Sequence, residues 1–338
     1  MKSKKILKAI IIATIAIAMI AGLTSCGNYS AETIVTNTTD VSQYFSGIVI
    51  NTSDSDVYFQ PSTDGKVSVV CRESKKIYHS VTVEANTLII DEIDTRSDIE
   101  KLRPGISLFA RTIIVYLPVG EYADLAVEID TGDIDIPAGY TFNNVDIEND
   151  TGNIYFKSNA EVLELNTDTG TIKISELTAT NIKLDTDTGD ISVEDVSSKV
   201  INADTDTGDI NILYSDIDGA LNASADTGKI QLTDVSCTRS EISNNTGKIV
   251  LHSLLSKEEI KVTADTGDIK LLYSDAPSII LETTTGDVHA TILSDKQFDI
   301  TTDVGDINIP EDAGEQTCKI TTDTGDITVI VEKILVVE

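Results

Sequence analysis

The chain has no tryptophan, only three histidines and few basic residues to balance its acids. Aromatic residues make up 5% of the 338 positions, and 25 Lys and Arg stand against 56 Asp and Glu, for a formal charge of −31. Such an excess of acid argues against nucleic-acid binding and against direct docking on anionic lipid headgroups. It favours cations or basic partners instead.

Signatures of catalysis are also missing. His79, His252 and His289 do not cluster in the sequence, and no metal-ligand spacing, phosphate-binding loop or nucleophile elbow is present. Most of the acids recur at fixed positions of the sequence repeat described below. A catalytic residue would instead differ from the residues at the same position of the other repeats. Without tryptophan, the usual platform for stacking on sugar rings is absent as well. We therefore expect no catalytic residue and no cofactor.

The exceptions to the repeat are few. Arg239 lies in an irregular repeat and is the nearest candidate for a catalytic side chain, although a solvated surface charge is the simpler interpretation. Tyr214 and Tyr273 occupy matching positions in two repeats and are candidate contact residues, with loop packing as the simpler alternative.

Four cysteines are too few, and wrongly placed, for a disulfide framework. Cys26 is assigned below to a lipid, which leaves Cys71, Cys237 and Cys318, an odd number. Cys237 and Cys318 lie about four repeats apart, which corresponds to roughly 19 Å in a stack of strands and exceeds the reach of a disulfide. Cys318 occupies an apolar column, so we expect it in the core.

The amino-terminal segment is typical of an export signal. Four lysines precede an apolar stretch of 14 residues, which is short for a membrane span, and the stretch ends in Leu-Thr-Ser-Cys at Cys26. This ending resembles the lipobox of bacterial lipoproteins, which implies cleavage before Cys26 and lipidation of that residue. We predict a signal peptide at 1–25, a polar tether at 26–43 and an extracytoplasmic, lipid-anchored protein. An uncleaved anchor is the alternative. Cleavage removes four lysines and no acid, which takes the formal charge from −31 to −35.

A short phrase, D-T-G-D-I or a close variant, recurs eleven times from residue 130 onward. Successive glycines of this phrase are 18 to 20 residues apart, which is typical of a solenoid in which each repeat is one coil. The phrase glycines, which we expect at structural turns, are Gly132, Gly152, Gly170, Gly189, Gly208, Gly228, Gly247, Gly267, Gly286, Gly305 and Gly325.

Apolar columns flank each glycine and predict strands. Aliphatic residues recur seven and five positions before the glycine and two and four positions after it, so alternate residues face inward within each half. The phase changes across the Thr-Gly step, and this change predicts a corner where glycine accepts positive φ. The fold expected is all-β, a parallel β-helix of about eleven coils at 125–338. Stacked at strand spacing, eleven coils would measure roughly 50 Å.

Residues 44–124 lack this regularity and predict a strand-rich head that caps the first coil. The strands expected there are 47–51, 57–60, 66–72, 81–85, 87–91 and 112–117. The stretch 50–57 is similar to a repeat with Ser55 in place of glycine, which indicates a degenerate coil within the head.

Aspartates form two further columns, two positions before and one position after the glycine. One interpretation is that each aspartate hydrogen-bonds its own turn while solvent screens the charge. The alternative is weak calcium binding by stacked carboxylates, for which Asp187, Asp190, Asp206 and Asp209 are the candidate ligands. Lys229 and Lys248 interrupt the second column and exclude an unbroken channel of ions. We favour the first interpretation.

The whole arrangement resembles the bacterial "putative adhesin" family, a domain of unknown function. The resemblance rests on the lipoprotein-like start, the strand-rich head ending near Ile114-Val115-Tyr116-Leu117-Pro118, and the serial T-G-[DNK]-I phrase, and it covers residues 44–338. It implies a cell-envelope β-solenoid, and it assigns no catalytic residue. We predict a non-catalytic binding or structural module whose partner is a protein or a glycan. The alternatives are a carbohydrate-active β-helix enzyme, a lyase or hydrolase, and a calcium-stabilised surface scaffold.

Overall fold

The computed structural model describes residues 33–101 and 111–333. The chain divides into two compact units, Met1–Thr33 and Ile34–Glu338, and only the second is described below. The predicted signal peptide, Cys26 and the tether up to residue 32 lie outside the described residues. Among the residues that are described, no helix has the length and apolarity needed to cross a bilayer.

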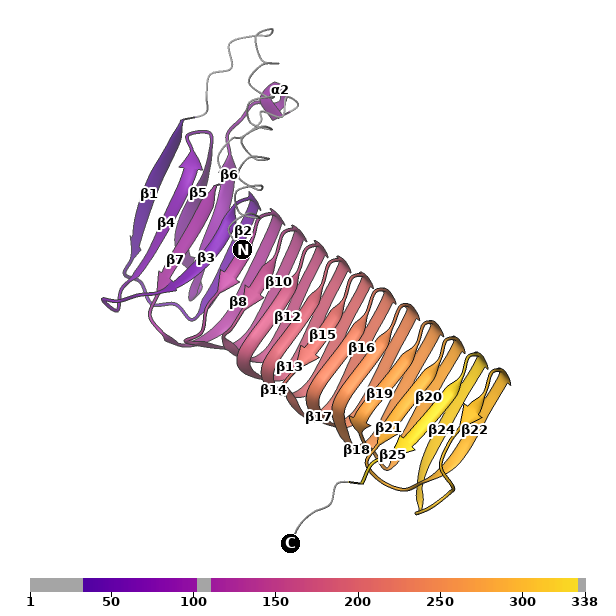
Figure 1. Cartoon of the computed structure of the whole chain (residues 1–338). Helices are drawn as coiled ribbons and strands as arrows, with labels where there is room; N and C mark the ends of the chain where they lie inside the picture. The colour runs from indigo at the N-terminus through magenta and orange to yellow at the C-terminus, as the bar shows by residue number, and fades with distance from the viewer. Residues whose placement is uncertain (1–32, 102–110, 334–338) are drawn as a thin grey trace, which may run out of the picture. The chain divides into compact units, whose positions relative to one another are not determined.

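The repeats form a β-solenoid of stacked coils, as the sequence predicted (Figure 1). Each coil runs along one strand to its Thr-Gly corner and continues in a second strand on the other side. The solenoid strands are β8 (Gly120–Thr131), β9 (Ile134–Ile136), β10 (Tyr140–Thr151), β11 (Ile154–Phe156), β12 (Asn159–Thr169), β13 (Ile172–Thr188), β14 (Ile191–Thr207), β15 (Ile210–Leu213), β16 (Asp216–Thr227), β17 (Ile230–Thr246), β18 (Ile249–Thr266), β19 (Ile269–Ser274), β20 (Ser278–Thr285), β21 (Val288–Ile292), β22 (Lys296–Val304), β23 (Ile307–Asn308), β24 (Gln316–Thr324) and β25 (Ile327–Val331).

Neighbouring coils pair in parallel and in register. Between β13 and β14, for example, Ile172 pairs with Ile191, Leu184 with Ala203 and Thr188 with Thr207. Because equivalent residues lie side by side, each apolar column becomes a continuous row inside the stack. Isoleucines two positions after the glycine, such as Ile172, are fully buried except in the outermost coil, which holds Ile307. Complete burial of such a side chain stabilises a fold by about 1.5–3 kcal/mol.

The three cysteines of the described residues are unpaired and buried. Cys318 lies in the apolar core, as predicted, where it pairs in register with Ile279 on one side and Phe298 on the other.

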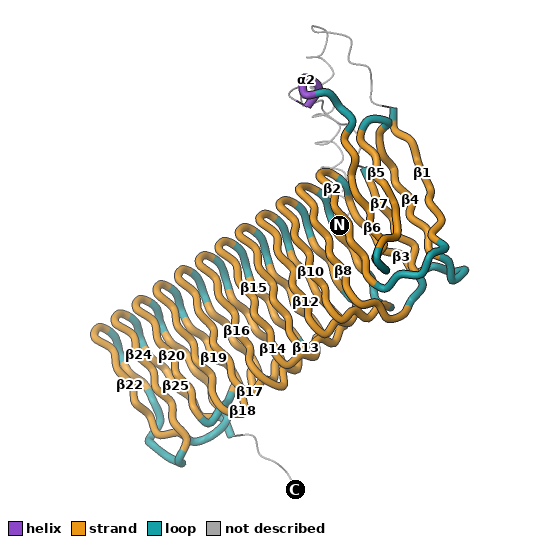
Figure 2. The backbone as a smooth tube through the Cα atoms, turned by 180° about the vertical axis from the view of Figure 1, so that it is seen from behind, coloured by secondary structure: helices purple, strands orange, loops and turns teal. Residues whose placement is uncertain are grey.

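A second corner lies six residues after the glycine, and the sequence analysis did not find it. The tube in Figure 2 shows the repeated bends of the coils. Six consecutive coils place a non-glycine residue there with φ between 51° and 56°; these are Glu176, Asp195, Tyr214, Asp234, Ser253 and Tyr273. The left-handed region is costly for most side chains, so this corner is imposed by the stacking of the coils and not by local preference.

The head continues both sides of the solenoid as two sheets. One side carries β2, β6 and β5 beyond β8, and the other carries β3, β7, β4 and β1 beyond β9. The head elements are β1 (Ile34–Val41), β2 (Gly47–Asp54), β3 (Asp56–Pro61), β4 (Val67–Ser74), β5 (Ile77–Glu84), β6 (Thr87–Asp94), α2 (Asp98–Lys101) and β7 (Thr112–Leu117). The six head strands that the sequence predicted correspond to β2 to β7.

The degenerate coil expected in the head is present. Ile50 pairs with Val127 and Val57 with Ile134, so β2 and β3 stack on the first regular coil. Ser55 occupies the glycine position, because an added Cβ on Gly132 would approach the Ser55 carbonyl oxygen to 2.4 Å.

One sequence-based assignment requires correction. The predicted tether at 26–43 includes β1, which pairs antiparallel with β4 along its whole length. Its central side chains are polar and exposed, so the strand lacks the alternation that sequence analysis recognises. It is held as an edge strand through its backbone.

The last two coils stack in the reverse of their order in the sequence. β20 pairs with β24, and β24 pairs in turn with β22, so residues 316–331 lie between the coil of Gly286 and the coil of Gly305. Figure 1 shows β20, β24 and β22 in this order. The outer coil leaves apolar side chains in contact with solvent: Val304 is 64% exposed and Ile307 is 46% exposed.

Candidate functional site

The Thr-Gly corners form a row along one edge of the stack. All eleven phrase glycines lie at these corners with φ between 143° and 159°. At Gly189 an added Cβ would come within 1.8 Å of the Gly170 carbonyl oxygen, so no larger residue fits without moving the backbone. The glycines therefore allow successive coils to approach closely.

In most coils, the peptide after the glycine turns out of the strand ladder and is bonded by side chains. Where the residue three positions before the next glycine in the stack is Thr or Asn, its side chain donates a hydrogen bond to the glycine carbonyl oxygen; Ala225 and Ala264 supply no such donor. Thr186 Oγ1 donates to Gly170 at 3.1 Å, Thr205 Oγ1 donates to Gly189 at 3.1 Å, and Asn244 Nδ2 donates to Gly228 at 2.8 Å. These donors point inward and are buried. This explains the polar column inside an otherwise apolar core.

The amide of the same peptide is bonded by the aspartate column that follows the glycine. The backbone N–H of Asp209 donates to Asp190 Oδ1 at 2.8 Å, and the N–H of Lys229 donates to Asp209 Oδ1 at 2.8 Å. These carboxylates thus bond the next coil and not their own turn, contrary to the interpretation that we favoured. Lys229 receives such a bond through its backbone N–H, but its ammonium group has no lone pair to accept one from the next coil, so a lysine interrupts the pattern.

The four predicted calcium ligands are not brought into one ligand set. Asp187 and Asp206 are exposed in the column before the glycine, while Asp190 and Asp209 each hold a backbone amide. Within residues 33–101 and 111–333, the sole group of three potential ligand residues with atoms close enough to share an ion lies in the head. Calcium at these four aspartates stays a hypothesis.

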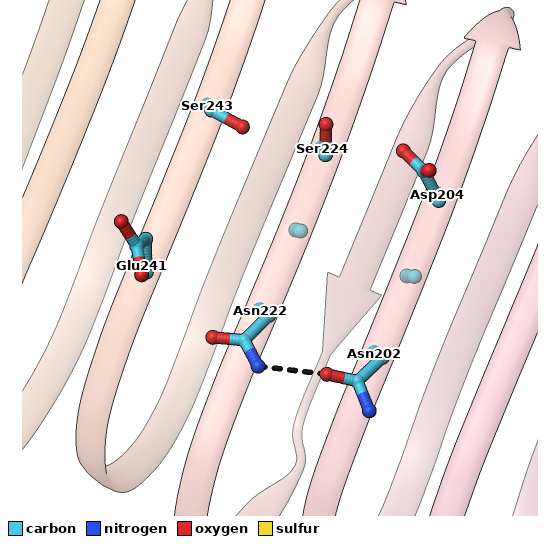
Figure 3. A pocket seen from close by; sticks show the side chains of 8 residues that line it. Asn202, Asp204, Asn222, Ser224, Glu241 and Ser243 are labelled. Atoms are coloured by element: carbon cyan, nitrogen blue, oxygen red, sulfur yellow. Dashed lines mark hydrogen bonds between the residues drawn. The ribbon is translucent and has the colours of Figure 1, made fainter.

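The outer face of the strands before the corners has a shallow hollow of about 290 Å³. Figure 3 shows the labelled side chains that project from β14, β16 and β17 around it, with Asn222 Nδ2 donating to Asn202 Oδ1 at 2.7 Å. The hollow arises because Ser224 and Ser243 are short where the preceding coils carry Asp185 and Asp204. It offers amide, hydroxyl and carboxylate groups that suit a polar ligand.

A second hollow, of about 450 Å³, lies between the head and the first coil. It is lined by Asn51, Thr52, Ser53, Asp91, Glu92, Glu128 and Asp130. Burial acts to raise the pKa of Glu92, but hydrogen bonds from Ser53 and Thr52 and the positive charge of Arg111 outweigh it, so the pKa lies below the ordinary value. A carboxyl held ionised in this way is unsuited to the general-acid role that a glycosidase requires.

The remaining candidates from the sequence lie apart from one another. Tyr214 and Tyr273 occupy the second corner and are 58% and 45% exposed, and Tyr273 packs edge-on against His252 at 5.6 Å between ring centroids. Arg239 forms ion pairs with Glu258 at 3.2 Å and Glu259 at 3.9 Å, as a surface charge does. The three histidines lie on β5, β18 and β21.

The repeat and head together match a known family. A model of the Toastrack DUF4097 family matches residues 45–252 and 220–336. The chain belongs to the Toastrack DUF4097 family. No curated protein matches the chain in sequence.

The solved structures that resemble the chain include proteins of three bacteria. A "putative adhesin" from Bacteroides fragilis is 22% identical, with a TM-score of 0.46 over 63% of this chain and 93% of that one. A "putative lipid binding protein" from Parabacteroides distasonis is 13% identical, with a TM-score of 0.35 over 86% and 96%. A "putative cell adhesion protein" from Clostridium sporogenes is 11% identical, with a TM-score of 0.22 over 89% and 100%. At these values the likenesses carry no functional argument for this Toastrack chain.

Two features of this Toastrack chain escaped the sequence analysis, although one left a signal. The inward column three positions before the glycine holds Thr or Asn in all coils except those of Ile129, Ala225 and Ala264, and a polar residue at an inward position indicates a buried hydrogen bond. The second corner left no comparable signal, because its six residues share no chemistry.

Proposed function

We propose that this protein is a non-catalytic binding or structural module of the bacterial cell envelope, exported by the signal at 1–25 and anchored through a lipid on Cys26. The solenoid presents a long, acidic, polar surface to an extracytoplasmic protein or glycan. Family membership supports the envelope solenoid, and the lipobox-like ending supports the anchor.

One observation carries the proposal. The acids are distributed along the stack at coil spacing, and those of the column after the glycine are engaged in holding backbone amides between coils. Neither hollow contains a histidine, lysine or arginine among its lining residues. A glycosidase requires one carboxyl with a raised pKa as its general acid, whereas the pKa of Glu92 in the second hollow is lowered by its hydrogen bonds and by Arg111.

Anchoring is tested by replacing Cys26. The wild-type chain and Cys26→Ala are expressed in a bacterial host that is fed a radiolabelled fatty acid. We expect label and membrane fractionation for the wild type, and loss of the label for the variant. Cys237→Ala is the matched control, and it should keep the label. A labelled Cys26→Ala chain would contradict the assignment.

Binding is tested with the purified full chain on arrays of glycans and of basic and acidic proteins. We expect binding to weaken as ionic strength rises, because salt screens the attraction between the exposed carboxylates and the charges of a partner. The double variant Asp204→Asn, Glu241→Gln removes both carboxylates from the hollow of Figure 3. The double variant Asp303→Asn, Asp323→Asn removes two carboxylates near the far end of the stack and is the control. Turnover of a polysaccharide on the same array would favour the enzyme alternative.

A further inference from the structure

Three metal-binding side chains converge in the interior of the head. Cys71 and Glu73 stand two residues apart on β4 and face the same way, and His79 comes from β5 after a short turn. The sulfur, a carboxylate oxygen and an imidazole nitrogen all lie within 4.8 Å of one another. All three residues are buried. Sulfur, nitrogen and oxygen in one buried set are the ligands that zinc takes in proteins.

Two of the three ligands, Glu73 and His79, are oriented by neighbours outside the group. His79 Nδ1 donates to Glu73 Oε2 at 3.0 Å, and the other ring nitrogen, Nε2, lies 3.0 Å from the Thr52 hydroxyl. Thr52 Oγ1 donates in turn to Glu92 Oε2 at 3.1 Å. The second oxygen of Glu73 accepts a hydrogen bond from Asn37 Nδ2 at 2.5 Å. A metal-ligating histidine characteristically has its second ring nitrogen held by such a polar chain ending in a carboxylate.

The charges of the group suit a divalent cation. A divalent metal ion binds cysteine as the thiolate and displaces the thiol proton. One thiolate, one carboxylate and a neutral imidazole then balance a charge of +2 in a site that solvent does not reach.

We propose that Cys71, Glu73 and His79 bind one zinc ion, or a similar transition-metal ion, through Sγ, Oε2 and Nδ1. The metal replaces the proton that lies between His79 Nδ1 and Glu73 Oε2, and His79 Nε2–H donates to Thr52. Calcium and magnesium are excluded as occupants because they require oxygen ligands.

The position of the site gives the ion a structural task. Cys71 and Glu73 belong to the sheet of β9, β3, β7, β4 and β1, whereas His79 belongs to the sheet of β8, β2, β6 and β5. A metal ion would therefore link the two sheets at the head end of the stack, beyond the last parallel coil that the described residues form. Terminal repeats of solenoids require a cap of this kind.

The test uses the full chain, refolded with Co²⁺ alone and then titrated with Zn²⁺. We expect one Co²⁺ per chain with a thiolate-to-cobalt absorption band, displacement of the band by Zn²⁺, and a higher Tm with Zn²⁺ than with Mg²⁺. Cys71→Ala and His79→Gln should abolish the band. Cys237→Ala is the matched control, because Cys237 is equally buried and belongs to no such ligand group, and it should keep the band.

Metal retention by the wild-type chain tests the proposal even if a variant fails to fold. Refolded wild-type protein that retains no stoichiometric metal, by elemental analysis after dialysis, overturns the proposal. A band that persists in folded Cys71→Ala overturns it too, since the sulfur would then be another cysteine. Circular dichroism of each variant shows whether it has folded.

Discussion

Thr186 Oγ1 donates a hydrogen bond of 3.1 Å to the carbonyl oxygen of Gly170, one coil away. The pair shows how the solenoid resolves a conflict between close packing and hydrogen bonding. Glycine lets the backbones approach at the corner, and the approach turns one peptide out of the ladder. A buried carbonyl without a partner costs about 1–3 kcal/mol, and the inward threonine removes that cost.

The first prediction concerns this threonine. Thr186→Val keeps the shape of the side chain but leaves the Gly170 carbonyl without its donor, so we expect a loss of about 1–3 kcal/mol in the free energy of unfolding. Thr188→Val is the control, because Thr188 is exposed and the equivalent residue of another coil is already Val304. Urea unfolding followed by circular dichroism measures both. Equal effects of the two changes would contradict the role given to Thr186.

The second prediction separates steric contact from backbone conformation. Gly208 and Gly120 share a φ of 159°, but an added Cβ meets the Gly189 carbonyl oxygen at 1.8 Å in the first and nothing within 4 Å in the second. We expect Gly208→Ala to prevent folding or lower the free energy of unfolding by about 3 kcal/mol or more, as overpacking against a fixed backbone does. Gly120→Ala should cost less, about 1–3 kcal/mol, because only the strain of the positive φ acts there. Thermal unfolding of both variants would reveal the difference, and similar Tm values would refute it.

The third prediction concerns the second corner. Tyr214 has a φ of 51°, a conformation that asparagine tolerates better than tyrosine. Tyr214→Asn should therefore raise the free energy of unfolding by about 1 kcal/mol. The same change at Tyr155, an exposed strand residue outside the left-handed region, should lower it because tyrosine favours strands. Differential scanning calorimetry of the two variants provides the comparison, and a destabilised Tyr214→Asn would argue against strain at this corner.

The fourth prediction concerns charge along the stack. Burial, and next the charge of Asp204 on the adjacent coil, raise the pKa of Asp185 above its ordinary value. A carboxyl whose pKa is raised in the folded state binds more protons there than in the unfolded chain. Its contribution to stability is therefore full below the unfolded pKa and is lost as the pH rises through the folded pKa.

Asp185→Asn should remove this loss. We expect the variant to match the wild type near pH 3 and to exceed it at pH 7 by about 1 kcal/mol or less, the size of one screened carboxylate pair at strand spacing. Asn166→Asp, which adds a carboxylate to the same column one coil earlier, should have the opposite effect at pH 7. Unfolding curves collected from pH 3 to 7 measure both, and a pH-independent gain from Asp185→Asn would contradict the argument.

Much of the fold follows from residues that repeat. Apolar residues such as Ile172 and Ile174 alternate with polar ones within each strand, which predicts the strands and the shared core. The alternation changes phase across the glycine, which predicts the corner. Ser55 could be placed as a degenerate glycine because its neighbours keep the pattern. A periodic sequence specifies its fold this directly because each coil contacts only its neighbours.

The features that escaped prediction share a physical reason. β1 pairs through its backbone and carries polar side chains, so its sequence resembles a linker. Tyr214 and Glu176 take the same left-handed conformation although nothing in their chemistry requires it. For the head, Glu73 was the available signal, since it is a charged residue at an inward position of β4 after Val69 and Cys71. Its partner His79 is joined to it by the packing of two sheets, which a single sequence does not display.

The exchanged places of the last two coils bear on how such a chain lengthens. Because residues 316–331 fill the slot next to the Gly286 coil, the chain emerges from the stack one layer inside its outer face. A copy inserted among the earlier coils simply pushes its neighbours apart by one layer. A copy added directly after Val331 would have to pass over the Gly305 coil before it found an open edge. Duplication events are therefore accommodated in the middle of the rod, where the stretch at 206–216 recurs almost unchanged at 265–275.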